Sequence, residues 1–259
     1  MPHNHHHGEG KTLWITGASG GLGPGICRIL GKSGYKLGLH AGVHPESLRR
    51  LAGELTTNGV EVTVTSGDLS EPGVAAQAFN HVSELLGTPY GVVHLAGPYA
   101  QGKVADFSRE DFDRMLSGNL TTLFEVVKAA VPSMREAGGG RIVAMGMVGA
   151  NHTMPMRLNG PHLAAKAGVV ALVRTLALEE APNGITANVI NPGNITLKDL
   201  DRAAARATKT KSTHPMGVHG SYEDLANAIL YLLSDGASYV TGAVLDVTGG
   251  WMNPDTSFE

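Results

Sequence analysis

The sequence has 259 residues, one cysteine, 5% aromatic residues and a formal net charge of −3. The single cysteine, Cys27, excludes an intramolecular disulfide, and its place in a predicted helix indicates a reduced, buried, structural thiol. The near-neutral charge offers no electrostatic surface for a nucleic acid or an anionic membrane. Because no run of about 18 apolar residues is present, we expect no membrane-spanning segment. Because no secretory signal is recognisable, we expect a cytoplasmic protein.

Four histidines stand near the start of the chain, at positions 3 and 5–7. They precede the first predicted strand, which favours an expression tag or a leader without fixed structure over a metal site. We therefore predict no metal ligands and divide the chain in two. Residues 1–10 are the expected leader, and residues 11–259 are one domain.

Glycine, in contrast, is abundant, with 35 residues. The segment 16–23 reads Thr-Gly-Ala-Ser-Gly-Gly-Leu-Gly and lies between an apolar strand at 13–15 and a helical pattern at 22–30. Such a turn lets a pyrophosphate approach the backbone, and the helix N-terminus supplies N–H groups and partial positive charge. Glycine-rich turns are common, but a strand before and a helix after favour a phosphate site over a simple tight turn.

Strands and helices alternate along the rest of the chain, without a linker, repeat or composition break. This order is typical of a parallel sheet with helices on both faces. The prediction is an α/β protein, a single-domain Rossmann fold with a doubly wound, seven-stranded parallel sheet. Further strands are expected at 35–40, 60–65, 90–95, 140–145, 185–190 and 243–247, and further helices at 45–58, 71–86, 109–116, 119–137, 158–181 and 222–233.

Several residues fall at or just past the predicted ends of strands. Because ligands of open parallel sheets bind at the carboxyl ends of the strands, we expect these residues along one edge of the sheet. The longest irregular region, 192–220, is typical of a lid or of a solvated loop, and both interpretations stay open. The strand-end residues are Thr16, His40, Asp68, Ala96, Met145 and Asn191.

These motifs, in this order, resemble those of the single-domain short-chain dehydrogenase/reductase family over nearly the whole chain after the leader. The glycine turn matches the family's cofactor loop, and residues 94–97 match its Asn-Asn-Ala-Gly motif with the asparagine pair replaced. Residues 191–193 match the turn beside the nicotinamide, and residues 239–250 match the terminal strand with its glycine pair. The resemblance implies NAD or NADP as cofactor, with contacts at Gly17, Ser19, Gly21, Leu22, Gly23, His40, Asp68, Leu69, Ala96, Gly97, Lys166, Pro192, Gly193 and Ile195.

The resemblance also implies four catalytic positions. In the family a tyrosine handles the substrate proton, and a lysine four residues later lowers its pKa and binds the nicotinamide ribose. A serine hydrogen-bonds the substrate oxygen, and an asparagine holds a relay water. Here the tyrosine position is His162, the lysine is Lys166 and the asparagine is Asn119. Gly146 and Met147 stand where serines belong, and the gap from Met147 to His162 is two residues longer than usual, so we expect a remodelled loop between them.

His162 has two interpretations that stay open. Imidazole is an effective proton donor or acceptor near neutral pH, and a charged Lys166 would favour its neutral form. Alternatively, His162 is a polar residue at the start of a helix in a protein that has lost the redox role. Asn119 is either part of the relay or a helix cap. His152 could replace the lost serine, although an ordinary loop histidine is favoured.

The cofactor preference rests on the end of the second strand. An NAD-specific member would carry an acid there, but the positions are Ala41 and Gly42. The arginine that many NADP users carry in the loop is also absent, since that position is Gly20. Because no acid would repel a 2′-phosphate, and His40 and His44 could contact one, the sequence favours NADP.

We therefore expect an NAD(P)-dependent oxidoreductase of the carbonyl reductase or alcohol dehydrogenase type, acting on a small-molecule substrate. Two alternatives follow from the changed serine and tyrosine positions. One is a non-redox enzyme, such as a dehydratase or cyclase, and the other is a non-catalytic nucleotide-binding protein. The resemblance further implies a homodimer or homotetramer that associates through the helices at 119–137 and 158–181.

Overall fold

The structure is a computed structural model that describes residues 8–42, 45–193, 195, 200–208 and 215–251. Within these residues seven strands form one sheet in the order β3-β2-β1-β4-β5-β6-β7, and every neighbouring pair is parallel. The strands are β1 (Thr12–Thr16), β2 (Lys36–Ala41), β3 (Val62–Ser66), β4 (Gly91–His94), β5 (Gly140–Met145), β6 (Ile185–Pro192) and β7 (Val244–Val247). The helices are α1 (Gly23–Lys32), α2 (Pro45–Thr57), α3 (Val74–Leu86), α4 (Arg109–Leu116), α5 (Thr122–Glu136), α6 (Gly160–Glu180), α7 (Arg202–Ala207) and α8 (Tyr222–Leu233).

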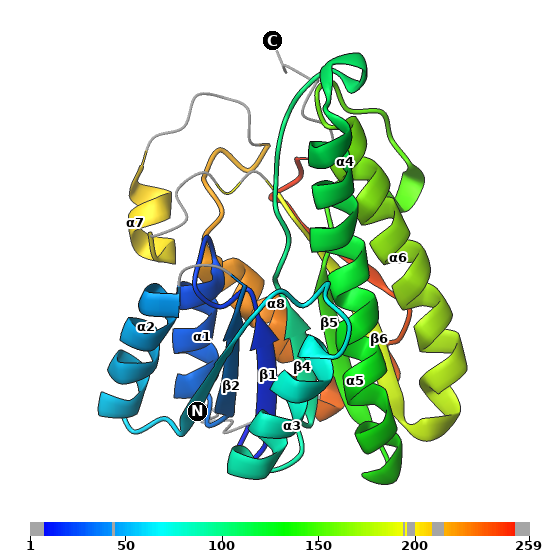
Figure 1. Ribbon diagram of the computed structural model, residues 1–259. Helices are drawn as coiled ribbons and strands as arrows, with labels where there is room; N and C mark the ends of the chain where they lie inside the picture. Colours follow the sequence, from blue (N-terminus) through cyan, green and yellow to red (C-terminus); the bar gives the residue numbers. More distant parts are fainter. Residues whose placement is uncertain (1–7, 43–44, 194, 196–199, 209–214, 252–259) are drawn as a thin grey trace.

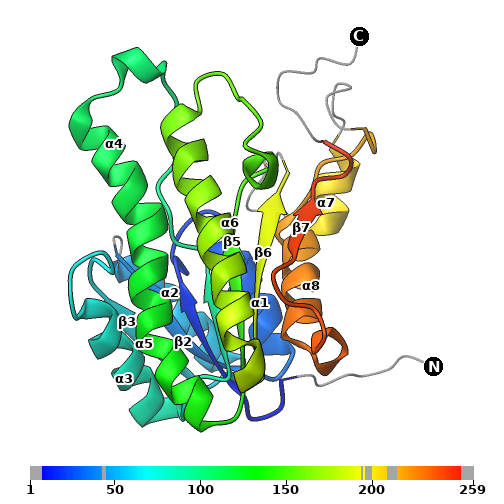
Figure 2. The same ribbon diagram turned by 90° about the vertical axis from the view of Figure 1, so that its right-hand side faces the viewer.

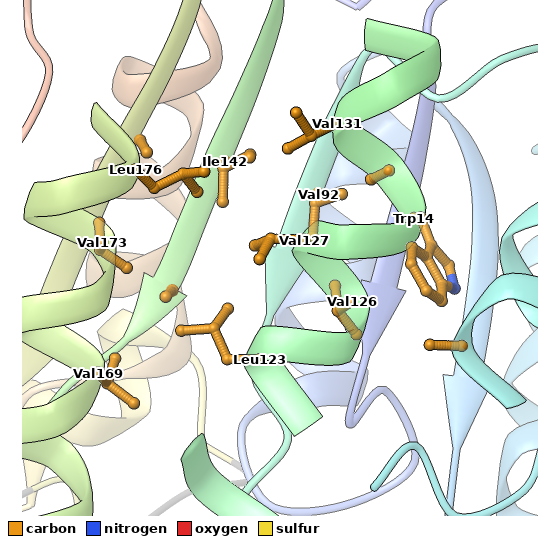
Figure 3. Packing of buried hydrophobic residues seen from close by; sticks show 14 of the residues in the cluster. Trp14, Val92, Leu123, Val126, Val127, Val131, Ile142, Val169, Val173 and Leu176 are labelled. Carbon is orange, nitrogen blue, oxygen red and sulfur yellow. The ribbon is translucent and has the colours of Figure 1, made fainter. Parts of the chain in front are cut away.

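The central strands bury side chains on both faces, as a parallel sheet between two helical layers requires. In β1, Trp14 belongs to one hydrophobic cluster, whereas Leu13 and Ile15 belong to the other. Trp14 meets Phe79 of α3 edge to face, with ring centroids 5.6 Å apart. Figure 3 shows the first cluster, in which α5 and α6 pack their apolar side chains against β4 and β5.

The two helical layers confirm the predicted doubly wound fold. Helices α3, α5 and α6 bury residues in the first cluster, and α1, α2 and α8 bury residues in the second. Figures 1 and 2 show α4 leading into α5 beside α6, with α1 and α8 across the sheet. Cys27 of α1 lies in the second cluster, where burial raises the pKa of its thiol to about 12. The prediction of a buried structural thiol is therefore confirmed.

The long helix α6 is a core helix. Together with the 3-10 turn that follows it, it forms Gly160–Asn183, the one stretch among the described helices with the length and hydropathy to cross a bilayer. Half of its apolar window is buried inside the protein. Val169 and Val173 pack in the first cluster (Figure 3), so the apolar composition of α6 is accounted for by the sheet it covers.

Several elements differ from the predicted ones, and three of these differences have a clear local reason. Helix α6 begins two residues later than predicted because Leu158 has a φ of +63°, a left-handed value that a right-handed helix excludes. Helix α3 begins only after Gly73, whose φ is +85°. The region 192–220, predicted to be irregular, contains α7, because the Asp201 side chain caps its N-terminus.

Packing also starts earlier than predicted at the N-terminus. Residues 1–7, most of the expected leader, lie outside the described residues. Gly8 is buried against the ring of Tyr35, and its N–H donates to the carbonyl of Ser33 at 3.2 Å. Gly8, which falls inside the segment expected to be a leader, is therefore packed against the domain.

The strand order reverses between β1 and β4, and this reversal positions the site. In doubly wound sheets the loops after two such strands diverge and leave a crevice at the carboxyl edge. Thr16 and His94 are register partners at this edge. The loop after β1 leads to α1 on one face, and the loop after β4 leads to α4 on the other (Figure 1).

Candidate functional site

A cleft of about 720 Å³ opens at the carboxyl ends of β1, β2, β3 and β4. Gly17 and Gly21 of the turn after β1 have φ values of +74° and +56°, which glycine adopts without strain. A Cβ at Gly17 would lie 2.6 Å from the backbone nitrogen of Ala96, so the turns after β1 and β4 touch at the strand reversal. Helix α1 begins in this turn without a side-chain cap, which leaves its N-terminal positive potential open to a ligand.

Most of the predicted cofactor contacts line this cleft. They come from the turns after β1, β3 and β4 and from the end of β2. The turn after β3 is fixed by Asp68, whose Oδ1 accepts hydrogen bonds from the N–H and the hydroxyl of Ser70 at 2.8 and 2.7 Å. The predicted residues in the lining are Gly17, Ser19, Gly21, Leu22, Gly23, His40, Asp68, Leu69, Ala96 and Gly97.

His40 lines the cleft, but its imidazole is engaged within the protein. Nδ1 lies 2.9 Å from the hydroxyl of Thr65, and Nε2 lies 3.0 Å from the carbonyl oxygen of Gly67. Burial lowers the pKa of His40, which favours the neutral ring. A neutral imidazole with both nitrogens bonded has no N–H left for a phosphate. The phosphate contact predicted for His40 is therefore not available in this structure, and His44 lies outside the described residues.

His94, at the end of β4, connects this strand to β1 and α5. Its Nδ1 lies 2.8 Å from the hydroxyl of Thr16, and its Nε2 lies 3.4 Å from the hydroxyl of Thr122. Because Thr122 donates its own proton to the carbonyl of Gly118, it accepts from Nε2–H, and Thr16 donates to Nδ1. Burial, and next the charge of Lys166, lowers the pKa of His94 to about 3. The neutral ring thus joins β1 and β4 to α5.

Lys166 lies on α6, beside Gly97 of the cleft lining. Its Nζ donates to the carbonyl oxygen of Met145, at the end of β5, at 2.7 Å. Burial lowers the pKa of Lys166 to about 8, so the ammonium form still dominates at neutral pH. A Cβ at Gly97 would lie 3.4 Å from this Nζ and 2.2 Å from Oδ1 of Asn119. Both side chains therefore reach over Gly97.

Asn119 lies in a π-helical segment, Ser117–Thr121, between α4 and α5. Its Nδ2 donates to the carbonyl oxygens of Pro98 and Met115, both at 3.0 Å. Its Oδ1 is buried and has no partner among the described residues. Asn119 is not the N-cap residue of α5, a position that Thr121 holds. It leaves an acceptor beside Gly97 for a donor that enters the cleft.

His162 is neutral, as predicted, but chiefly for a different reason. Burial, followed by the charge of Lys166, lowers the pKa of His162 to about 4. A contact with the backbone of Pro98 partly opposes this shift of the pKa, and Nδ1 is buried without a partner among the described residues. A neutral imidazole has one N–H and one nitrogen with a free lone pair. Tyr99 covers the ring edge to face, with centroids 5.0 Å apart.

The residues after β5 bring no hydroxyl group to the cleft. A Cβ at Gly146 would lie 2.2 Å from Oδ1 of Asn191, so this position has no room for a side chain. Met147 packs against the first hydrophobic cluster. His152, the alternative donor, is exposed in the 3-10 turn Ala150–His152, and its ring makes no hydrogen bond within the described part of the chain. The structure therefore favours an ordinary loop histidine.

The remaining predicted contacts lie outside the large cleft. Gly193 and Ile195 line a smaller cavity of about 250 Å³ at α7, α8 and the end of β7. A Cβ at Gly193 would lie 2.7 Å from Cα of Thr248, so the chain is closely packed there. Pro192 ends β6 and lines neither cavity. Apart from Pro192, the predicted cofactor contacts thus lie in the large cleft, at Lys166 beside Gly97, or in the smaller cavity.

Several lining residues were not predicted from the sequence. Arg114, Ser117 and Thr122 reach the cleft from α4, the π-helical segment and α5, and only the packing of these helices brings them there. Tyr99 lines the cleft too, two positions after Gly97. Its place just past a predicted strand end was a usable signal, because ligands contact such loops.

Comparison with known proteins gives a consistent result. A family model described as enoyl-(acyl carrier protein) reductase matches residues 17–252. The 3-oxoacyl-[acyl-carrier-protein] reductase of Pseudomonas aeruginosa is 32% identical over 244 residues, covering 93% of this chain and 97% of that protein. The D-beta-hydroxybutyrate dehydrogenase of Rhizobium meliloti is 28% identical over 255 residues, covering 93% of this chain and 98% of that protein. A solved structure of a short-chain type dehydrogenase/reductase from Mycobacterium ulcerans matches with a TM-score of 0.83 and 29% identity, covering 95% of this chain and 90% of that one. The chain belongs to the short-chain dehydrogenase/reductase family.

Proposed function

We propose that this protein is an NAD(P)-dependent oxidoreductase that interconverts a carbonyl and an alcohol on a small organic substrate, with His162 in place of the family's tyrosine. The main observation behind this proposal is that the side chains of Asn119 and Lys166 meet over Gly97, beside the large cleft. His162 lies one helical turn from Lys166. A buried lysine with a lowered pKa, a neutral imidazole with a free lone pair and an unpartnered amide oxygen form a set that can bind and pass a proton.

The groups in the cleft fit a dinucleotide. The volume of about 720 Å³ lies within the range of about 300–1,000 Å³ usual for ligand pockets. The contact between the turns at Gly17 and Ala96 leaves bare backbone where a pyrophosphate would lie. The N–H groups of Lys166 that are not bonded to Met145 complement the hydroxyl groups of a ribose.

Bound NAD(P) would supply the hydride transfer. The residues of the chain orient the substrate and move its proton. In the direction of alcohol oxidation, the neutral imidazole of His162 accepts the hydroxyl proton, directly or through a water. Lys166, with a pKa of about 8, exchanges a proton with solvent near neutral pH, and Oδ1 of Asn119 orients a water in that relay. Carbonyl reduction follows the same path in reverse.

NADP is the proposed cofactor. The end of β2 carries Ala41 and Gly42, so no carboxylate there repels a 2′-phosphate. A Cβ at Gly20 would have no atom within 4 Å, so the turn leaves open space on this side of the cleft. His40 adds no positive charge, because its ring is neutral and bonded. The preference therefore rests on space and the missing acid, and we expect it to be modest.

The named relatives suggest where to look for the substrate. One is a 3-oxoacyl reductase and the other a beta-hydroxybutyrate dehydrogenase, so both names describe an acyl compound with oxygen on carbon 3. The substrate panel therefore includes acetoacetyl-CoA, acetoacetate and 3-hydroxybutyrate. Crotonyl-CoA is added because the family description names enoyl reductases.

The first experiment is a fluorescence titration with NADPH and NADH, followed by turnover measured as a change in NADPH absorbance. We expect binding of both cofactors, with NADPH tighter. His162→Ala should lower turnover by about 10²–10⁴-fold, the usual contribution of a general acid or base. Lys166→Met should weaken NADPH binding about tenfold, since it removes a hydrogen bond from a charged group. His152→Ala, an exposed histidine of the neighbouring loop, is the matched control and should change neither.

The outcomes separate the proposed function from its alternatives. Turnover of the panel with the nicotinamide unconsumed would instead support a non-redox enzyme. Tight NADPH binding without any turnover would support a non-catalytic binding protein. Unchanged turnover in His162→Ala would exclude the imidazole from the proton path.

A further inference from the structure

In the proposed reaction Asn119, His162 and Lys166 have roles, but no residue yet donates a hydrogen bond to the substrate oxygen. In carbonyl chemistry negative charge develops on the substrate oxygen, and a fixed donor there stabilises the transition state. Gly146 and Met147 have no hydroxyl, and His162 is assigned to the substrate proton. The segment after β5 therefore offers no donor for the substrate oxygen, which leaves the other loops at the cleft to supply one.

Tyr99 carries a hydroxyl group and lies beside His162. Its ring packs edge to face on His162, at an interplanar angle of 86°. The side chain lines the large cleft and the residue is 58% exposed, so both solvent and a ligand reach it. The hydroxyl donates to Oδ1 of Asn159 at 2.9 Å.

The partner of this hydroxyl is itself fixed. Asn159 is 5% exposed, and its Nδ2 donates to the carbonyl of Arg157 at 2.9 Å, which leaves Oδ1 as the side directed at Tyr99. An amide oxygen and a substrate carbonyl oxygen are the same kind of acceptor. Rotation of the Tyr99 O–H bond can therefore redirect its hydrogen bond from Asn159 to a substrate oxygen, while the ring stays against His162.

Two loops hold this arrangement. The N–H of Gly102 donates to the carbonyl of Leu158 at 2.8 Å, which joins the loop after β4 to the loop before α6. Leu158 has the left-handed φ noted above, a strained conformation for leucine that the bond helps to maintain. A Cβ at Gly160 would lie 2.6 Å from Cγ2 of Val104, so the two loops are also in close contact.

We infer that the Tyr99 hydroxyl donates the hydrogen bond to the substrate oxygen, the role that the family gives to a serine, and that Asn159 is its positioning residue. The inference rests on the proposed function and adds a substrate contact to it. His162 then handles the proton, and Tyr99 stabilises the oxygen to which that proton is bound. The donor lost after β5 is supplied by the loop after β4.

The test compares Tyr99→Phe with wild type on whichever of acetoacetyl-CoA and acetoacetate the wild type reduces faster. The substitution removes the hydroxyl and keeps the ring against His162. We expect kcat/KM to fall about 10²-fold or more, mainly through kcat, with NADPH affinity unchanged. Tyr231→Phe is the control, because Tyr231 is 49% exposed on α8 and lines neither cavity.

A double-mutant cycle tests the positioning role of Asn159. Asn159→Ala alone should lower kcat about tenfold, because the hydroxyl loses its alignment. Added to Tyr99→Phe, it should cause almost no further loss, since the group it positions is already gone. A purely structural role of Asn159 would give additive losses.

Three results would overturn the inference. Tyr99→Phe within twofold of wild type, while His162→Ala is inactive, would place the donor elsewhere and leave the proposed function intact. A raised KM with unchanged kcat would make Tyr99 only a wall of the pocket. A wild-type protein that neither binds NADPH nor reduces any panel member would remove the proposed function, and the inference with it.

Discussion

Buried histidines should make this protein sensitive to mild acid, and two of them have large pKa shifts. Burial comes first among the causes that lower the pKa of His94 to about 3 and of His162 to about 4, both from an ordinary value of 6.5. Below pH 6.5 the unfolded chain therefore binds protons that the folded chain does not. The free energy of unfolding falls as the pH decreases, until the pH reaches the folded pKa of each ring.

The size of the effect follows from the two shifts. Between about pH 7.5 and about pH 5, linkage gives each histidine a loss of about 2 kcal/mol. Both rings are more than nine-tenths buried, so solvent screens little of this effect. Together they amount to about 4 kcal/mol, a large part of the roughly 5–15 kcal/mol that holds a typical domain folded.

The assay is urea unfolding followed by circular dichroism at both pH values. His94→Asn replaces a titrating ring by an amide that can still reach Thr16, and it should reduce the difference between the two free energies of unfolding by about 2 kcal/mol. Carboxylates that titrate in the same window act equally in both proteins and cancel. His152→Asn, an exposed histidine, is the control. If His94→Asn keeps the full wild-type pH dependence, the ring is not held neutral by burial.

Two further predictions concern Gly97 in the cleft lining and the exposed face of α5. Gly97→Ala would place a Cβ 2.2 Å from Oδ1 of Asn119, and we expect a loss of about 1–3 kcal/mol in urea unfolding together with weaker NADPH binding. Phe124 of α5 is 47% exposed, and we propose that it lies in the interface of a homodimer or homotetramer. Light scattering after gel filtration should then show a smaller species for Phe124→Glu, and an unchanged mass would exclude this face.

The fold could be predicted because its signals are local and repeated. Apolar strands such as residues 13–15 alternate with helical patterns, and both are read from short windows of sequence. The glycine turn was equally readable, since close contacts such as that of Gly17 with Ala96 require the absence of a side chain. The family model matches residues 17–252, which include most of this turn.

The electrostatic state of the site could not be predicted from spacing. The sequence placed Lys166 one turn from His162 and made its charge the reason for a neutral ring, whereas burial contributes more. His40 was expected to meet a phosphate, but Thr65 and Gly67 use both of its nitrogens. Such partners come from neighbouring strands, and which of them reach a ring depends on packing that a single-chain pattern does not contain.

Some local geometry was also beyond the sequence. Asn119 was expected in a relay or at a helix cap, and the structure places it in a π-helical segment with its amide bonded to Pro98 and Met115. No residue type marks such a segment as Gly or Pro marks a turn. Tyr99 and Asn159 lie 60 positions apart, so their hydrogen bond exists only because two loops pack together.

The packing at the end of β5 explains why the loop after β4 suits a hydrogen-bond donor for the substrate oxygen better than positions 146 and 147. The missing side chain of Gly146 makes room for Asn191, whose Nδ2 donates to Asp246 at 2.8 Å and so links β6 to β7. A serine at position 146 would displace that amide, and the link between the two strands would be lost with it. At position 147 a serine would remove a side chain that packs on the hydrophobic core. Restoring a hydroxyl after β5 therefore disturbs the sheet edge or the core, whereas the loop that carries Tyr99 can present one without cost to either.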